Sequence, residues 1–314
     1  MEGKEMKKIA MYWGAGCGGC DVSLLSLHEK ILDLLEEAEI VFWPCAMDFK
    51  YEDLEKMKDG SIDIAFYNGA IRTEENEEIA KLLRKKSKIL VAYGSCATEG
   101  CVIGLANLYS REEIFDTVYL KNETTKNEDG IIPSSNDLHL PEFLPHLKTL
   151  EQVVKVDAFI PGCPPPKPVL ENALEALLQG KTEFGKSVAL CDECPRKDSK
   201  PEKIEINKFY RWHEKEDNGD CFLAQGIICM GPATRAGCEA ECISANIPCT
   251  GCMGAVPKVR EQGISMLSAL ASILGDMDEE KEKEIIESLQ DVVGTFYKYA
   301  TAKLLPEGRL KDES

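Results

Sequence analysis

The chain of 314 residues carries fourteen cysteines, and most of them stand in short, closely spaced groups. Thiolates at such spacings bind zinc ions or iron–sulfur clusters. The charged first residues contain no apolar export signal, so we expect the chain in the cytoplasm, where disulfides are disfavoured. The alternative, that all these cysteines are ordinary buried thiols, fits poorly because they are not scattered. Metal binding or redox chemistry is therefore the leading interpretation.

Four of the cysteines follow apolar runs that have the length of buried strands. They stand in the stretches GAGCGGCD, YGSCATEG and PGCPPP, as Cys17, Cys20, Cys96 and Cys163. Glycines around the first pair let the backbone approach a bulky ligand. In open parallel sheets, ligands bind beyond the carboxyl ends of the strands, so these loops aim four thiols at one sheet edge. Four thiolates there would hold a 4Fe-4S cluster or a zinc ion.

The elements that position these loops alternate between strand and helix. Strand-like runs cover residues 8–13, 39–43, 62–67, 89–93 and 157–160, and helical patterns cover residues 22–38, 73–86 and 169–178. This alternation predicts an α/β fold with a parallel sheet that has helices on both faces. We expect the flavodoxin-like, doubly wound order of strands. Thr73 is the expected N-cap of its helix, and the polar residues 120–150, punctuated by prolines, predict a long surface excursion.

A second group of eight cysteines lies in a stretch of 62 residues with little periodicity. Its spacing is C-x2-C-x26-C-x7-C-x8-C-x3-C-x6-C-x2-C, which supplies two sites of four thiolates. The compact run of bacterial ferredoxins is absent. Structural zinc remains the alternative, because C-x2-C pairs are common at such sites. Zinc explains the first group poorly, since a structural ion has no need of a sheet edge.

In combination, CGGC after the first strand, GSCATEG after the fourth and GCPPP after the fifth resemble the small subunit of nickel-iron hydrogenases, over about residues 7–255. The related complex I subunit carries adjacent cysteines in the first loop, whereas two glycines separate Cys17 from Cys20 here. The resemblance implies a proximal 4Fe-4S cluster, the one nearest the nickel-iron site, held by Cys17, Cys20, Cys96 and Cys163.

Carried over by order along the chain, the resemblance also assigns the second group. It implies a distal cluster held by Cys191, Cys194, Cys221 and Cys229, and a medial cluster held by Cys238, Cys242, Cys249 and Cys252. Many family members have a histidine as first distal ligand and a proline in place of one medial cysteine. Cys191 and Cys242 stand at those places, which implies three 4Fe-4S clusters held by cysteine alone. The split between the two sets stays open for Cys229 and Cys242.

The resemblance further implies a subunit of a hydrogenase, an oxidoreductase acting on hydrogen, whose nickel-iron site lies in a partner large subunit. A long, acidic chain without an export signal resembles the methyl-viologen-reducing (deazaflavin-non-reducing) hydrogenase of methanogenic archaea. There the small subunit passes electrons to an iron–sulfur adaptor subunit and on to heterodisulfide reductase. Two alternatives stay open: an electron-transfer subunit of a different redox complex, and a zinc-stabilised flavodoxin-like protein.

The composition excludes other classes of function. A net charge of −18 argues against a nucleic-acid or anionic-membrane partner, since both need clusters of Lys and Arg. No apolar run approaches the roughly 18 residues of a membrane helix. We expect a flavodoxin-like domain over 1–185, a cysteine-rich domain over 186–257 and a helical extension over 258–314. The extension should contain helices over 259–274 and 279–304, with an apolar stripe that packs on the core, and a polar tail.

A few residues remain outside these sets. Cys45 follows the second strand, near the same sheet edge, and Cys101 begins an apolar helix and is expected to be buried. Asp21 adjoins Cys20, but a carboxylate ligand is disfavoured because four cysteines are already available. The histidines are expected to be solvated or packed. His213 is the one that we single out, because it lies between the cysteines expected to hold the distal cluster.

Overall fold

The computed structural model describes residues 6–124, 126–135, 137–259, 261–274 and 278–304. By compactness the chain divides into two units: the first holds the residues up to Phe159 and from Thr301 onward, and the second holds Ile160–Ala300. Unit 1 is thus built from two separate stretches of chain. The division into three domains at residues 185 and 257 stays a prediction.

A five-stranded sheet in the order β2-β1-β3-β5-β7 forms the centre of unit 1. β1 pairs in parallel with β2 and β3, and β3 pairs in parallel with β5. The strands are β1 (Lys7–Trp13), β2 (Ala38–Phe42), β3 (Ile62–Asn68), β5 (Ser87–Tyr93) and β7 (Ala158–Ile160). All five were predicted from apolar runs, and their order is the predicted flavodoxin-like one.

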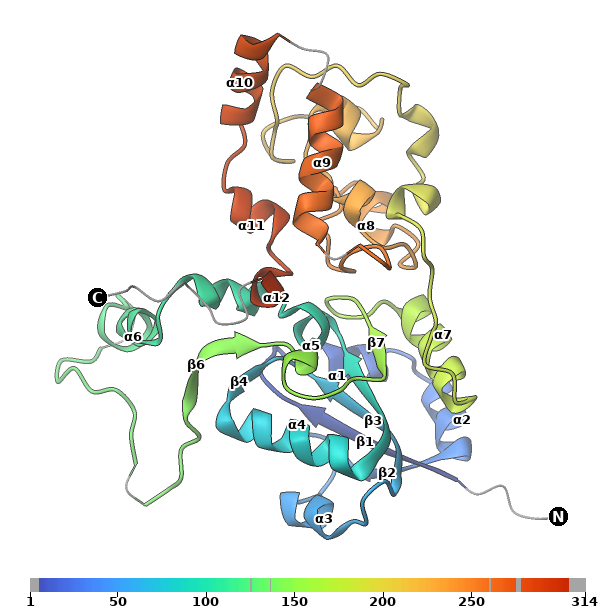
Figure 1. The fold of residues 1–314 in the computed structure, drawn as a ribbon, viewed down its shortest axis with the longest axis vertical. Helices are drawn as coiled ribbons and strands as arrows, with labels where there is room; N and C mark the ends of the chain where they lie inside the picture. Colours follow the sequence, from blue (N-terminus) through green and yellow to red (C-terminus); the bar gives the residue numbers. More distant parts are fainter. Residues whose placement is uncertain (1–5, 125, 136, 260, 275–277, 305–314) are drawn as a thin grey trace. The chain divides into compact units, whose positions relative to one another are not determined.

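Helix α4 (Glu74–Lys86) lies across one face of this sheet (Figure 1). Its buried apolar residues belong to the same core cluster as residues of the central strands: Ile79, Ala80 and Leu83. Thr73 caps the helix as predicted, because its hydroxyl accepts a hydrogen bond from the Asn76 N–H at 3.3 Å. Further helices of unit 1 are α3 (Tyr51–Lys56), α5 (Ser95–Glu99), η1 (Val102–Leu108), α6 (Arg111–Phe115), η2 (Asp116–Leu120), η3 (Leu150–Gln152) and α12 (Thr301–Leu304).

Two features of unit 1 differ from the prediction. The single helix expected over residues 22–38 is two helices, α1 (Gly19–Leu25) and α2 (Lys30–Glu37). The chain breaks between them at His28, whose φ of 54° is left-handed and cannot continue a right-handed helix. The excursion over 120–150 also contributes a strand, β6 (Phe143–Lys148), which pairs antiparallel with β4 (Ile71–Thr73). The sequence did not predict this small second sheet.

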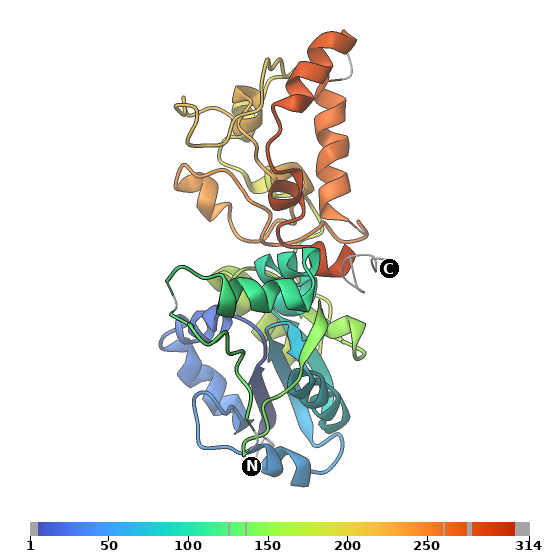
Figure 2. The same cartoon turned by 90° about the vertical axis from the view of Figure 1, so that its left-hand side faces the viewer.

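Unit 2 begins with α7 (Lys167–Leu178), close to the predicted helix. Its cysteine-rich part contains only short helices: η4 (Leu190–Glu193), η5 (Lys197–Ser199), η6 (Phe222–Gln225), η7 (Gly231–Ala233) and α8 (Glu241–Ser244). Helix α9 (Gln262–Leu274) packs against η7 and stands beside these loops, orange in Figures 1 and 2. The contacts of such short helices, rather than their own hydrogen bonds, must hold this part together.

The single long helix expected over 279–304 is wrong. The structure has α10 (Glu279–Glu287), α11 (Val292–Phe296) and then α12, which belongs to unit 1. Asp291 starts α11 with a φ of 47°, and its carboxylate accepts a hydrogen bond from the Gly294 N–H at 2.9 Å. The expected polar tail lies outside the described residues.

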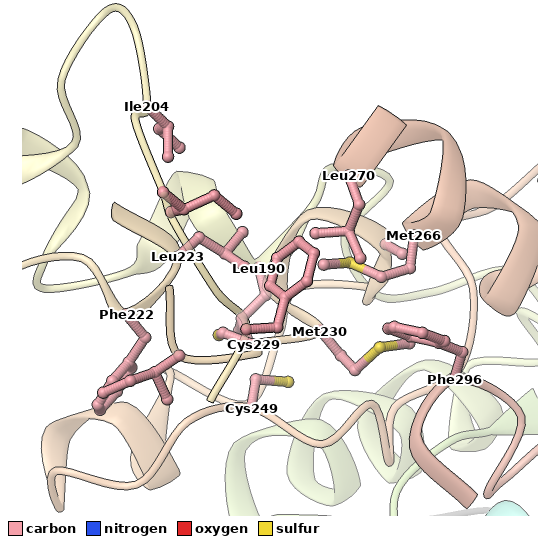
Figure 3. Packing of buried hydrophobic residues seen from close by; sticks show 14 of the residues in the cluster. Leu190, Ile204, Phe222, Leu223, Cys229, Met230, Cys249, Met266, Leu270 and Phe296 are labelled. Atoms are coloured by element: carbon pink, nitrogen blue, oxygen red, sulfur yellow. The ribbon is translucent and has the colours of Figure 1, made fainter. Parts of the chain in front are cut away.

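Buried apolar residues of unit 2 form a cluster (Figure 3). It joins η4 and η6 to α9 and α11, through Leu190, Phe222, Met266 and Phe296. Ile285 and Phe296 of the predicted stripe are buried here and Leu289 packs against them, whereas Val292 is exposed, so the stripe packs on the core only in part. Across the part of the chain that the structure describes, no helix is long and apolar enough to span a bilayer.

Candidate functional site

The first cysteine loop leaves β1 and turns directly into α1. Gly18 has a φ of 79°, and a Cβ there would come within 3.1 Å of the Trp13 ring, so only glycine fits. The next backbone N–H, that of Gly19, donates to Cys17 Sγ at 3.4 Å. The Tyr93 hydroxyl donates to the carbonyl of Cys20 at 2.7 Å. The loop is therefore held at the carboxyl end of β1, as predicted.

The Cys96 loop lies beside this first loop. Cys96 is in α5, directly after β5, and a Cβ on Gly16 would lie 4.0 Å from Cys96 Sγ. Ala15 and Ala70 exchange backbone hydrogen bonds of 2.9 and 2.6 Å, which fix the first loop to the end of β3. Within unit 1, the structure thus brings the two cysteine loops to one edge of the sheet.

Asp21 is buried next to Cys20, with 8 % of its surface exposed. Its carboxylate accepts hydrogen bonds from Trp43 Nε1 at 2.9 Å, from Asn68 Nδ2 at 2.8 Å and from Cys45 Sγ at 3.5 Å. Burial and the neighbouring carboxylate raise the pKa of the Cys45 thiol. Asp21 therefore ties the ends of β2 and β3 to the first cysteine loop, a structural role that the sequence did not reveal.

The other residues outside the main sets follow the sequence expectations. Cys101 is buried, with 2 % of its surface exposed. The exposed His139 side chain has its Nε2 3.0 Å from a carboxylate oxygen of Glu74. His213 is exposed and lies edge-on to the Trp212 ring, with ring centres 6.5 Å apart.

Unit 2 brings together a first set of four thiols. Cys191 has Cys194 and Cys221 as electrostatic neighbours, and Cys229 has Cys191 and Cys221. Burial, followed by these neighbours, raises the pKa of Cys191 to about 11; burial raises that of Cys229 to about 12, although backbone hydrogen bonds oppose the shift. Gly231 lies directly against two of these thiols, because a Cβ there would be 3.3 Å from Cys191 Sγ and 3.6 Å from Cys229 Sγ. These are the four residues predicted for a distal cluster.

The second set in unit 2 surrounds Cys252. Burial, together with the neighbouring Cys238, Cys242 and Cys163, raises the pKa of Cys252 to about 11. A backbone hydrogen bond from Cys163 acts in the opposite direction, so Cys163 lies directly beside Cys252. Cys249 does not neighbour the second set alone, since Cys252 of that set and Cys229 of the first set both lie near its sulfur. Figure 3 shows Cys229 and Cys249 inside the apolar cluster of unit 2.

Arg196 is a residue of this region that the sequence analysis missed. Its guanidinium is buried against the Phe222 ring at 4.0 Å and pairs with Asp217. It also donates to the Asp220 carbonyl and to Asn246 Oδ1, each at 2.9 Å. Its own backbone N–H donates to Cys194 Sγ at 3.4 Å. The one hint in the sequence is its place two residues after Cys194.

The donor chemistry of these sets fits iron–sulfur clusters. All fourteen cysteines lie in the described ranges, and none of them forms a disulfide there. Five cysteines of unit 2 belong to its apolar cluster or pack against it: Cys194, Cys221, Cys229, Cys238 and Cys249. Cys191 and Cys242 are exposed. Four thiolates are the donor set that binds a 4Fe-4S cluster. Among the described residues, no three His, Cys, Asp or Glu side chains converge in the way that one metal ion requires.

Comparison with known proteins places the chain in a family. The family described as "NADH ubiquinone oxidoreductase, 20 Kd subunit" matches residues 17–177. A subunit of the F420-non-reducing hydrogenase of Methanothermobacter marburgensis is 39 % identical over 316 residues, which cover 98 % of this chain and 99 % of the relative. The iron-sulfur subunit of the F420-non-reducing hydrogenase of Archaeoglobus profundus is 38 % identical over 308 residues, covering 93 % and 95 %.

A solved structure agrees with these relatives. The crystal structure of an NAD+-reducing [NiFe]-hydrogenase in the H2-reduced state contains a chain that is 29 % identical, with a TM-score of 0.51. The match covers 57 % of this chain and 96 % of that one. The cysteine loops at the sheet edge, the cysteine-rich second unit and these relatives lead to one conclusion: the chain belongs to the family of hydrogenase small subunits, among those of the F420-non-reducing hydrogenases.

Proposed function

We propose that this chain carries electrons between a nickel-iron large subunit and an acceptor protein through three 4Fe-4S clusters. The observation that supports this proposal best is that cysteines distant in the sequence lie close together in the folded chain. In unit 2, Cys194, Cys221 and Cys229 lie near Cys191, and Cys238, Cys242 and Cys163 lie near Cys252. Cys249 lies between the two groups, near Cys229 and Cys252. In unit 1, Cys96 and the first cysteine loop share one sheet edge.

The ligand sets of the proposal are those expected from the sequence. The proximal set is Cys17, Cys20, Cys96 and Cys163; the medial set is Cys238, Cys242, Cys249 and Cys252; the distal set is Cys191, Cys194, Cys221 and Cys229. Bound clusters would supply one-electron carriers whose potentials depend on ligands, hydrogen bonds and burial. The chain's own part is to hold the thiols together and to exclude water with the apolar cluster of unit 2.

The partners are proposed from the same resemblance. Hydrogen oxidation would take place in the large subunit, and the electrons would leave through an iron–sulfur adaptor subunit toward heterodisulfide reductase, in the cytoplasm. The names of the relatives, F420-non-reducing hydrogenases of Methanothermobacter and other archaea, support this subgroup.

Metal and sulfide content of the complex, purified without oxygen, tests the proposal. About twelve irons and twelve sulfides per chain, with nickel in the co-purified large subunit, are expected. About three zinc ions without sulfide would overturn it in favour of a zinc-stabilised protein. Iron and sulfide without nickel or hydrogen uptake would instead indicate a different redox complex.

Single substitutions then test the ligand sets. Because Cys163 lies beside Cys252, Cys163→Ser alone does not separate the proximal from the medial set. Cys17→Ser, in unit 1, is therefore compared with it. Both should remove the same cluster signal in electron paramagnetic resonance, lose about four irons and abolish hydrogen uptake, while Cys252→Ser removes a different signal. Cys101→Ser is the matched control and should lose no iron. Different signals lost in the Cys17 and Cys163 variants would refute the proximal set.

A further inference from the structure

Helix α12 packs into a space in unit 1 that is open because Gly100 and Gly104 have no side chains; we call this space the seat of α12. Ala302 is completely buried. A Cβ on Gly100 would lie 2.3 Å from the Ala302 Cβ, and one on Gly104 would lie 3.1 Å from it. Gly100 also has a φ of 89°, so its conformation and its contact both require glycine. Residues some two hundred positions apart in the sequence are therefore in direct contact.

Polar contacts hold α12 in this seat. The Ala302 carbonyl accepts a hydrogen bond from Gln152 Nε2 at 3.2 Å. Lys303 Nζ forms ion pairs with Glu99 at 3.4 Å and with Glu151 at 3.2 Å. Glu99 is the last residue of α5, so α12 is tied directly to the end of that helix.

The seat is also in contact with a cysteine of the proposed proximal set. Ala302 forms a small apolar cluster with Ala70 and Leu147, and Cys96 packs against this cluster. Ala70 is the residue that exchanges backbone hydrogen bonds with Ala15 of the first cysteine loop. Helix α12 thus forms an ion pair with Glu99 at the end of α5, and it contributes Ala302 to the apolar cluster against which Cys96, near the start of α5, packs.

We infer that α12 is a clamp that positions Cys96, and that Ala302 and Lys303 are its positioning residues. The argument begins with the length of α5, which has five residues and is too short to hold its shape through its own hydrogen bonds. Its place depends on what packs against it, and α12 supplies an apolar contact and an ion pair. The inference rests on the proposed function, because it gives Cys96 the role of a cluster ligand.

Two truncated complexes test the clamp. Deletion of residues 301–314 removes α12, and deletion of residues 305–314 keeps it and is the matched control. The longer deletion should raise deuterium uptake of residues 95–104 at least tenfold and should lose about four irons, while the cluster signals of unit 2 remain. The control should behave as the full chain. Equal uptake and equal iron in both truncations would overturn the clamp.

Point variants keep the test independent of a folding failure. Ala302→Leu adds three carbons where Gly100 and Gly104 leave no room, and it should match the longer deletion. Ala302→Gly fits the seat and should retain its iron. Lys303→Ala removes only the ion pairs, and a smaller rise in uptake over 95–104 is expected, with β1 and β3 unchanged. If neither Lys303→Ala nor Ala302→Leu raised deuterium uptake over residues 95–104, the inference would be refuted. A full chain that lacks iron would instead refute the proposed function, while uptake at 95–104 still reports on the clamp.

Discussion

Arg196 and Asp217 form a two-pronged ion pair, in which each terminal guanidinium nitrogen lies 2.7 Å from one carboxylate oxygen. The pair joins the turn after Cys194 to the loop before Cys221. Ser199 strengthens the same connection, since its hydroxyl donates to the Arg196 carbonyl at 2.7 Å and accepts from the Cys221 N–H at 2.8 Å. Two cysteines far apart in sequence are thus held in register by polar contacts rather than by a regular helix or strand.

Arg196→Ala should destabilise unit 2 markedly. It removes the two-pronged ion pair with Asp217 and leaves the hydrogen-bond acceptors around the buried guanidinium without their donor. Breaking a buried ion pair of this kind costs about 3 kcal/mol. Denaturant unfolding of the oxygen-free complex measures the change. Lys197→Ala, at the exposed neighbouring position, is the control and should change stability little. A loss in Arg196→Ala no larger than in the control would contradict the assigned role.

The ion pair also predicts a dependence on pH. Hydrogen bonds from Arg196, and then from Gln225, hold the pKa of Asp217 well below its usual range. The stabilisation is therefore fully present above the unfolded pKa of about 4 and is lost as pH falls through the lower folded value. The difference in unfolding free energy between the wild type and Asp217→Asn should be constant from pH 7 to about 5 and shrink below that. A difference that grows on acidification would show that the sign is wrong.

Asp21→Ala should destabilise unit 1. It leaves Trp43 Nε1 and Asn68 Nδ2 without their acceptor in a buried site, at a cost of about 3 kcal/mol. Tryptophan fluorescence and denaturant unfolding both report on the change. Asp33→Ala, an exposed carboxylate on α2, serves as the comparison. Equal stability of the two variants would indicate that the Asp21 contacts contribute nothing.

Thr73→Ala removes the N-cap of α4. The loss of its hydroxyl leaves the Asn76 N–H without its capping acceptor and should cost about 1 kcal/mol. Thr73→Ser keeps the oxygen and should stay within a few tenths of a kcal/mol of the wild type in the same unfolding experiment. Identical losses in both variants would mean that the methyl group of Thr73, not its hydroxyl, matters.

The strands could be predicted because central parallel strands are buried on both faces. β3 is buried at six of its seven positions, so its sequence is an almost unbroken apolar run. The same burial fixes where the cysteine loops begin. The alternation of strands and helices, read as a flavodoxin-like fold, therefore predicted the strand order and placed Cys17, Cys20 and Cys96 at one edge.

The missed features depend on backbone angles or on long-range contacts. The leucine pattern over 22–38 continues through His28, although the chain there adopts a φ of 54°. β4 has three residues, and its partner lies about seventy positions away, so neither strand carries a local pattern. The Asp21 and Arg196 networks likewise join residues that only the folded chain brings together.

The return of Thr301–Leu304 to the first unit has a consequence for biosynthesis. A ribosome adds about 5–20 residues per second, and about 140 residues, those of Ile160–Ala300, separate the two parts of unit 1. The sheet and its cysteine loops therefore emerge on the order of ten seconds before α12 does. During that interval the seat at Gly100 and Gly104 is vacant. The nascent protein therefore completes unit 1 only after the whole of unit 2 has been translated.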